Sequence, residues 1–320
     1  MDVPAVRPAL SRVGLAGVEA VVRLGVDERS SQPFAARIDC VIEPAGDPGD
    51  GAERFEAAVA EVVRAVVVDT AGIRAERLVR EVAERVRERL RAPRVEVTVA
   101  ARFPERRPAP VSGTPTQEIS TLHAVAMASE HGTRRAVGVS AQGLTTAPQA
   151  QRAIAADARG RLARDGFADD RIARVLDHVP VATHDQRGFG TLHVGCPEDA
   201  TLDFDVLALL AIVEGAMSSE IFELMKRSDE GAVVDRAHRR PRTAEDCVRA
   251  MIAGAVEHLA GAPDDVFVAV AQEHFETVHR HTLVAERAGR LGDLRAEIEA
   301  DVAPRPLSLR AWLDATGRRG

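Results

Sequence analysis

Hydrophobic and polar residues alternate in two stretches near the start of the chain. Apolar side chains recur at two-residue spacing over residues 11–24 and again over residues 34–42. This period is typical of β-strands with one buried face, so the pattern predicts a pair of strands. Gly14 and Gly17 interrupt the first run, and we expect a β-bulge there.

Helical spacing replaces this alternation further along. Apolar residues recur every three or four positions over residues 54–68 and 73–90, with charged residues between them, which predicts two amphipathic helices. Alternation then returns over residues 95–103, 118–129 and 134–144, and predicts further strands.

The second half of the chain repeats this order. Residues 148–179 are expected to be helical with a break near Gly166, and a strand is expected over residues 189–196. The remaining expected elements are helices over residues 207–225 and 244–260 and strands over residues 265–272 and 282–288. Two copies of one plan fit an α+β fold, in which helices pack on one face of an antiparallel sheet. We therefore expect two modules, residues 1–160 and 161–320.

The composition narrows the class of protein. At 320 residues and 45% hydrophobic content, the chain can bury a core without disulfides or a structural metal. Its three cysteines are far apart and form no C-x-x-C motif. No apolar run reaches the ~20 residues that cross a bilayer, and the first residues lack the order of a signal peptide. We expect a cytoplasmic protein with no membrane partner.

Charge and aromatic content argue against nucleic acid as a partner. The chain carries 49 acidic and 42 basic residues and a net charge of −7, unlike the basic footprint of nucleic-acid-binding proteins. With one tryptophan, no tyrosine and 3% aromatic residues overall, few side chains could stack on unpaired bases.

Histidine and carboxylate side chains gather in the second half. His279 and His281 are two apart, so both rings would face one side of an extended strand, and Glu276 would face the other side unless the strand ends there. Imidazole and carboxylate groups suit zinc, iron or manganese. A solvated or core-satisfied pair is the alternative interpretation.

Two other positions carry groups capable of chemistry. His184 and Arg187 belong to the segment THDQR (183–187), which we place in a loop, where catalytic groups and ordinary polar residues both collect. Glu220 falls in the helix predicted over residues 207–225, and a surface carboxylate is the alternative there. The buried stripe of that helix would comprise Ile221, Leu224 and Met225.

Five segments together resemble one family, the archaeal-type, metal-dependent GTP cyclohydrolases (GTP cyclohydrolase IV) and their bacterial type IB relatives. The segments are PVSGTPTQEISTL (110–122), VGVSAQGLTTAPQAQ (137–151), VPVATHDQRGFGTL (179–192), SSEIFELMKRSDEGAVVDRA (218–237) with PRTAEDCVR (241–249), and EHFETVHRH (273–281). Their order and spacing are similar to the family's across most of the chain.

The resemblance implies a pair of tunnelling-fold (T-fold) modules in each chain. It also implies a homo-oligomer, expected to be a tetramer, with active sites between subunits. The family reaction opens the imidazole ring of GTP by metal-activated water, releases formate and leads to a dihydropterin. The small-molecule partner would be a purine nucleotide or a pterin-like compound.

Roles are implied for the positions that match the family's motifs. His184 matches a histidine that donates a proton to the imidazole ring, and Glu220 is expected to be catalytic with it. The implied metal ligands are Glu276, His279, Glu220 and His281. The last of these is either a ligand or a residue that orients a ligand through a hydrogen bond. The implied substrate-binding residues are Arg187, Asp235 and Gln149.

Three sites depart from the family pattern. They are Ala147 and Gln149 in place of cysteines, Arg54-Phe55 in place of His-Met-Ser-Arg-Phe with Gly51 near the histidine's place, and Asp235 in place of glutamate. The first of these removes the expected thiolate ligand. A surviving site would offer only nitrogen and oxygen donors, so we expect a divalent metal, Fe²⁺ first and Mn²⁺ or Zn²⁺ as alternatives.

These departures leave three interpretations open. The chain is an enzyme acting on GTP or a related purine with a rebuilt metal site, or a diverted or inactive paralogue that binds a purine or pterin. The third is an enzyme that opens a different heterocycle in a specialised pathway. The shorter Asp235 favours the third, because a gap at a buried hydrogen bond costs the original ligand ~1–3 kcal/mol.

Overall fold

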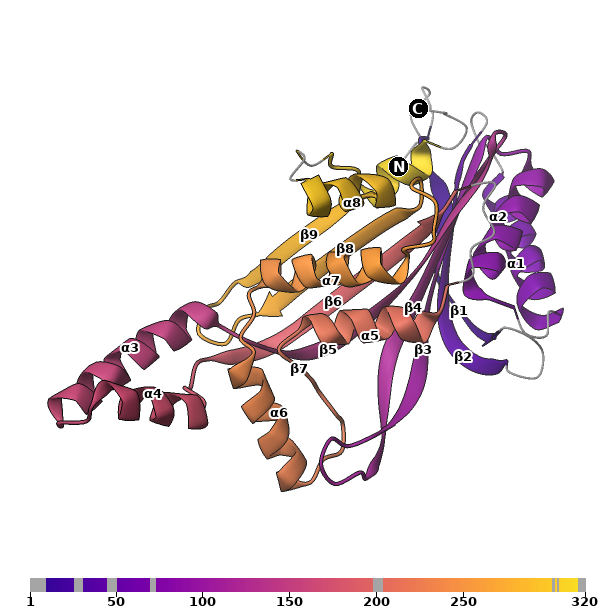
Figure 1. Ribbon diagram of the computed structural model, residues 1–320. Coiled ribbons are helices and arrows are strands. Elements are labelled where there is room, and N and C mark those ends of the chain that lie inside the picture. The colour runs from indigo at the N-terminus through magenta and orange to yellow at the C-terminus, as the bar shows by residue number, and fades with distance from the viewer. Residues whose placement is uncertain are drawn as a thin grey trace, which may run out of the picture.

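Nine antiparallel strands form one sheet in the computed structural model, which describes residues 10–25, 31–44, 51–69, 73–197, 204–300, 303 and 305–315 (Figure 1). The strands pair in the order β1-β2-β3-β4-β5-β6-β8-β9, and β7 also pairs with β5. Their bounds are β1 (Val13–Leu24), β2 (Gln32–Glu43), β3 (Arg94–Pro108), β4 (Pro115–Ser129), β5 (Gly132–Thr146), β6 (Asp185–Cys196), β7 (Ser219–Glu220), β8 (Phe267–Phe275) and β9 (Thr282–Arg290). The predicted α+β fold with an antiparallel sheet is confirmed.

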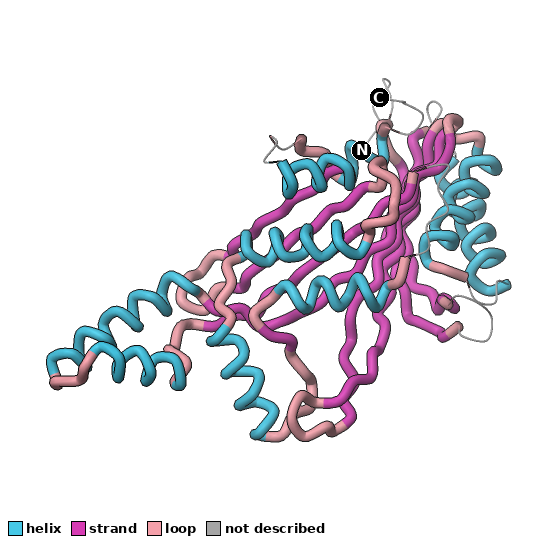
Figure 2. Tube along the Cα trace, in the orientation of Figure 1, coloured by secondary structure: helices cyan, strands magenta, loops and turns pink. Residues whose placement is uncertain are grey.

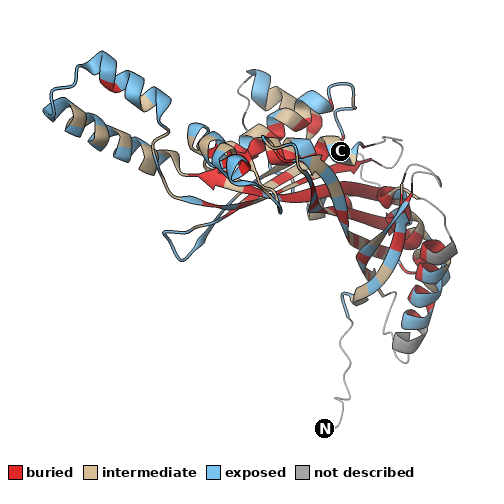
Figure 3. Ribbon diagram, turned by 90° about the horizontal axis from the view of Figure 1, so that it is seen from below, coloured by how far each residue is buried: buried red, intermediate tan, exposed pale blue. Residues whose placement is uncertain are grey.

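Helices α2, α5 and α7 cover one face of this sheet. The helices described are α1 (Gly51–Asp69), α2 (Ala75–Leu90), α3 (Pro148–Arg164), α4 (Asp169–His178), α5 (Val206–Ala216), α6 (Arg227–Arg239), α7 (Ala244–His258), α8 (Leu291–Ala300) and α9 (Leu309–Asp314). Helix α2 contacts β3, β4 and β5, whereas α5 and α7 contact strands from β5 to β9. The paired helices α3 and α4 project beyond the sheet (Figure 2), and Figure 3 shows them largely exposed.

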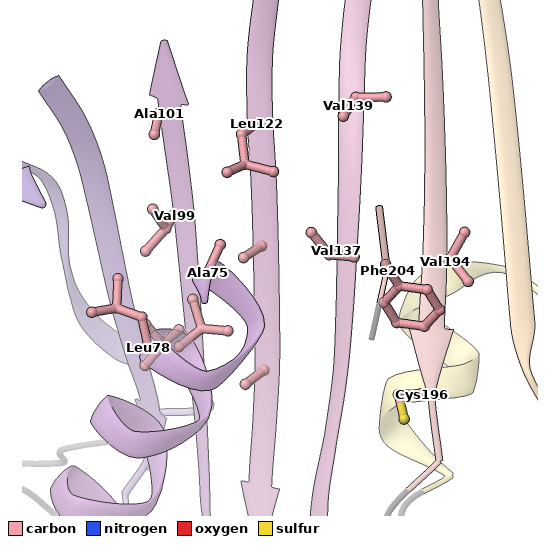
Figure 4. Packing of buried hydrophobic residues seen from close by; sticks show 14 of the residues in the cluster. Ala75, Leu78, Val99, Ala101, Leu122, Val137, Val139, Val194, Cys196 and Phe204 are labelled. Carbon is pink, nitrogen blue, oxygen red and sulfur yellow. The ribbon is translucent and has the colours of Figure 1, made fainter. Parts of the chain in front are cut away.

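Alternate strand residues build the core beneath these helices. Val95, Val97 and Val99 of β3 are at most 3% exposed, and Leu78 of α2 is 1% exposed. These side chains belong to one cluster, part of which Figure 4 shows. Burying an aliphatic side chain of this size contributes ~1.5–3 kcal/mol, so the one-sided pattern of the strands fixes which face the helices cover.

Two local predictions about glycines are confirmed. The β1–β2 register shifts between Leu15 and Val18, and Gly17 there has φ +77°, so a bulge interrupts β1. Gly166, with φ +86°, separates α3 from α4. A positive φ is accessible to glycine at no steric cost.

The helix predicted over residues 207–225 is wrong beyond Ala216. Helix α5 ends there, Met217 adopts an extended conformation (ψ 173°), and the short strand β7 follows. The expected buried stripe is also wrong, because Leu224 is 69% exposed.

The neighbouring strand explains this change. Pairing of β4 with β5 ends at Thr121 and Ser140, so Gly143 and Leu144 lack β4 as a partner further along β5. Strand β7 pairs with both of these residues. Backbone polar groups in a folded chain need such partners, and this requirement outweighs the helical spacing of the apolar residues.

The opposite face of the sheet carries a smaller cluster that the sequence did not predict. Trp312 of α9 stacks on Phe267 with the ring centroids 5.1 Å apart, and both pack with Val125. Gly195 makes room for the indole, since a Cβ there would lie 2.7 Å from it. Helix α9 therefore packs on the face opposite to that covered by α2, α5 and α7.

The sheet runs without a break from β1 to β9. The predicted boundary at residue 160 falls inside α3, and the division into two modules stays a prediction. In the part of the chain described, no helix is both long and apolar enough to cross a bilayer.

Candidate functional site

Three strand ends meet at one margin of the sheet. Thr146 of β5 pairs with Asp185 of β6, and Arg187 of β6 pairs with Phe275 of β8. The next residues, Ala147, His184 and Glu276, therefore leave the sheet close together. Strand β8 ends at Phe275, one residue before Glu276. Glu276 therefore need not follow the alternation of side chains along that strand.

His184 and Glu276 form the central pair of this margin. The imidazole Nε2 lies 3.3 Å from Oε2 of the carboxylate, and the two side chains are 19% and 4% exposed. Among the described residues, that buried Oε2 has no hydrogen-bond partner. A carboxylate oxygen withdrawn from water needs a hydrogen-bond donor or a cation, so the pair is suited to receive one.

The backbone ties the position of the missing thiolate to this pair. The amide of Ala147 donates to the carbonyl of His184 (3.3 Å), and the Thr183 hydroxyl donates to the carbonyl of Ala147 (2.9 Å). The Thr277 hydroxyl donates to the carbonyl of Asp185 (2.9 Å). Residue 147 thus adjoins His184, and it carries a methyl group where the family resemblance implies a sulfur ligand.

A buried polar layer lies behind the pair and was missed by the sequence analysis. His274 Nδ1 lies 3.4 Å from Gln186 Nε2, and its Nε2 lies 4.0 Å from Cys247 Sγ. Burial lowers the pKa of His274 and raises the pKa of Cys247 to about 12, so both are uncharged at neutral pH. Gln272 and His274 continue the buried side of β8 after Val268 and Val270, and polar residues at such positions were the available signal.

The other expected site residues belong to separate groups. Glu220 lies on β7 and accepts a hydrogen bond from Arg236 (2.5 Å), so its expected place on a helix is wrong. His279 and His281 stack on one another between β8 and β9, with centroids 5.0 Å apart. Among the described residues, no three His, Cys, Asp or Glu side chains converge as a metal site would require.

The expected substrate-binding residues are also spread out. Arg187 donates to Gln142 (3.2 Å) on the exposed side of β5 and β6. Asp235 on α6 accepts from Arg239 one helical turn later (2.9 Å). Gln149 is exposed in the first turn of α3. In the degenerate early motif, Phe55 is a core residue, whereas the side chains at 51 and 54 lie outside the described part.

One chain therefore fits part of a metal site. Glu276 and His184 supply an oxygen and a nitrogen donor. The observation that favours a cation there is the buried Oε2, which among the described residues has no partner besides its contact with His184. Structural and catalytic zinc sites use three or four protein ligands, so two donors are too few by themselves.

Comparison with known proteins gives the same family as the motifs. The family model described as "Type I GTP cyclohydrolase folE2" matches residues 2–285. The GTP cyclohydrolase MptA of Methanothermobacter thermautotrophicus is 34% identical over 304 residues, covering 93% of this chain and 94% of the relative. The MptA protein of Methanococcus vannielii is 31% identical over 303 residues, covering 92% and 96%.

Solved structures with this arrangement of strands include uricases. The uricase from Bacillus fastidious superposes with a TM-score of 0.50 at 9% identity, covering 94% of this chain and 100% of that one. At that identity the likeness concerns the fold alone, which is the tunnelling fold. The family model and these relatives show that the chain, with His184 and Glu276 at the margin of its sheet, belongs to the GTP cyclohydrolase family, a family of hydrolases.

Proposed function

We propose that this chain is a hydrolase that opens the imidazole ring of GTP, or of a related purine, toward a dihydropterin-type product. The pair formed by His184 and Glu276 is the observation that supports this most. It places a partly open imidazole against a buried carboxylate oxygen that has no other partner among the described residues. Such an imidazole can deliver a proton to a ring nitrogen of the substrate while the C–N bond breaks. Proton transfer of this kind contributes roughly 10²–10⁴-fold to a rate.

A divalent metal, when bound, would supply acidified water as the nucleophile. We propose Glu276, His279, His281 and Glu220 as its ligands, with Fe²⁺ first and Mn²⁺ or Zn²⁺ as alternatives. Strands β5 and β6 lie between β7 and β8, so the backbones of Glu220 and Glu276 are ~14 Å apart at ordinary strand spacing. The ligands would therefore come from two copies of the chain in a homo-oligomer, which we propose to be a tetramer.

The substrate would contact residues around this margin. We propose that Arg187 binds phosphate, since a guanidinium fork matches phosphate oxygens and its contact with Gln142 is a weak competitor. We propose that Asp235 and Gln149 bind the purine. Asp235 must then leave Arg239 or bind the substrate while paired with it.

The second function that we propose as an alternative is a catalytically diverted or inactive paralogue that binds a purine or pterin. The observation that favours it is Ala147, which adjoins His184 without the thiolate. An enzyme acting on another heterocycle in a specialised pathway is a variant of this alternative, favoured by the short and already paired Asp235.

Formate release tests the proposal. Protein purified without oxygen and loaded with Fe²⁺, Mn²⁺ or Zn²⁺ in turn should release formate from GTP. Glu276→Gln keeps the size of the side chain but removes its charge, and should lower kcat by about 100-fold or more. Glu273→Gln, three residues earlier on β8, is the matched control and should retain activity. If no formate is released with any of the three metals, and Tm rises on adding GTP or a pterin, the alternative of a ligand-binding paralogue is established.

A further inference from the structure

The distal part of the β3–β4 hairpin separates from the rest of the sheet. Pairing of β3 with β4 continues to Pro108 and Pro115, whereas pairing of β4 with β5 ends at Thr121. Figure 1 shows this extension reaching toward α6. The distal part, residues 104–119, must therefore be held by contacts other than the β5 strand.

Arg107 makes the first of these contacts. Its guanidinium donates to the Glu214 carboxylate (2.7 Å) and to the carbonyl of Ile221 (2.9 Å). It also lies over the Phe222 ring, 4.7 Å from the centroid. One side chain of the hairpin thus fixes the two residues that follow Glu220.

Glu118 makes the second contact. Both of its carboxylate oxygens lie 3.1 Å from the amide of Glu223, and one accepts from the Thr116 hydroxyl (2.8 Å). Glu118 is 7% exposed, so its charge is stabilised mainly by these donors.

Asp229 makes the third contact and is fully buried. One oxygen accepts from the amides of Val111 (2.9 Å) and Ser112 (2.7 Å) at the hairpin tip. The other accepts from the Ser112 hydroxyl (2.7 Å) and from the Lys226 amide (2.9 Å), where α6 begins. A helix cap alone needs only the last of these bonds.

We propose that Asp229 is a positioning residue, which locks the tip of the β3–β4 hairpin onto the start of α6 and so sets the places of Glu220 and Asp235. Its four hydrogen bonds occupy both oxygens, so it acts through its neighbours and not on the substrate. The same bonds, those from Ser112 foremost, hold the pKa of Asp229 well below its usual range, and the lock is therefore charged at neutral pH. The roles of Glu220 and Asp235 rest on the proposed function.

Helix α7 offers a matched control. Asp246 stands at the same position of a capping box, accepting from the Thr243 amide (3.1 Å) while Thr243 accepts from the Asp246 amide (3.2 Å). Hydrogen bonds from Thr243 likewise lower the pKa of Asp246. Asp246 also pairs with Arg249 on the same helix (3.4 Å), so Asp246→Asn removes a cap without touching the hairpin.

Two measurements on Asp229→Asn and Asp246→Asn test the positioning role of Asp229. Hydrogen exchange should speed up about tenfold or more at the amides of Val111, Ser112 and Glu223 in Asp229→Asn only. Because misplacement by about 1 Å can cost ~10²-fold in rate, kcat for formate release should fall about 10- to 100-fold in Asp229→Asn and stay within about twofold in Asp246→Asn. Ser112→Ala, a milder change at the same lock, should show both effects in smaller measure.

Each negative result has a distinct meaning. Equal losses of kcat in Asp229→Asn and Asp246→Asn, or unchanged hydrogen exchange at the hairpin tip, would overturn the proposal that Asp229 is a positioning residue. A wild-type protein that releases no formate would overturn the proposed function, and the exchange at these amides would then decide the lock without any activity. If Asp229→Asn does not fold, Ser112→Ala provides the test. Unchanged hydrogen exchange at the hairpin tip in that variant would overturn the proposed role of Asp229.

Discussion

At the scale of single residues, position 147 bears most directly on the metal site that we propose. Its backbone is bonded to that of His184, so a ligand at 147 would adjoin the pair of His184 and Glu276. Thiolate is a softer donor than carboxylate or imidazole and adds a negative charge beside the ion. The present methyl group contributes neither, so the metal site that we propose would depend mainly on the buried carboxylate of Glu276.

Restoring the thiolate should therefore raise metal affinity. We predict that Ala147→Cys with Gln149→Cys binds Zn²⁺ at least about tenfold more tightly than wild type, equivalent to about 1.4 kcal/mol. Competition with a chelator measures the affinity. Ala150→Cys, on the first turn of the same helix, adds a thiol further from His184 and should not reproduce the gain. Equal affinity in all three proteins would show that residue 147 does not face the site.

His193 makes the stability of the fold depend on pH. Burial, with a smaller contribution from His123, lowers its pKa to about 4, while the unfolded chain has the usual value near 6.5. Between these values the unfolded state binds more protons, so the free energy of unfolding falls as the pH falls from about 6.5 to about 4. We predict a loss of ~1–3 kcal/mol from this residue.

Urea unfolding at several pH values from 7 to 4 measures that loss. His193→Gln should show a flatter dependence of the free energy of unfolding on pH than wild type. His131→Gln, at an exposed turn between β4 and β5, should follow the wild-type curve. Parallel curves for His193→Gln and wild type would contradict the assignment.

At the scale of elements, the sequence predicted what depends on local pattern and missed what depends on distant partners. Strand β8 and helix α2 were found because a period of two or of 3.6 residues marks a buried side within a few residues. Strand β7 was missed because its cause is an unpaired stretch of β5, about 75 residues earlier in the chain. The docking of Trp312 above Gly195 likewise joins segments that no local pattern connects.

The candidate site shows the same limit. The two-residue spacing of His279 and His281 predicted rings on one side of an extended strand. The rings do stack, but they lie in bends between β8 and β9 and not on a strand. The pair of His184 and Glu276 joins residues 92 positions apart, and it could be anticipated only through the family resemblance. Hydrogen bonds between Asp229 and the hairpin tip, across 117 positions, had no signal in the sequence at all.

At the scale of the whole molecule, the separation of Glu220 from Glu276 by two strands is the main argument for a shared site. Carboxylate oxygens bind an ion at about 2.0–2.2 Å, and strand side chains stand roughly perpendicular to the sheet instead of reaching along it. Backbones ~14 Å apart in a rigid sheet therefore require either a large rearrangement or a second copy. The sheet is held by a continuous hydrophobic core, and a rearrangement would expose that core at a high cost. A second copy requires only that two surfaces meet.

Mixing two inactive variants distinguishes these possibilities. We predict that His184→Ala and Glu220→Gln are each inactive and that oligomers co-assembled from equal amounts of both regain activity. If each site takes His184 from one chain and Glu220 from another, random assembly leaves about a quarter of the sites intact, since each site draws its two residues independently. If both residues act within one chain, every site in the mixture carries a lesion and no formate is released above the level of the single variants. The recovered fraction thus reports directly which chain supplies each residue.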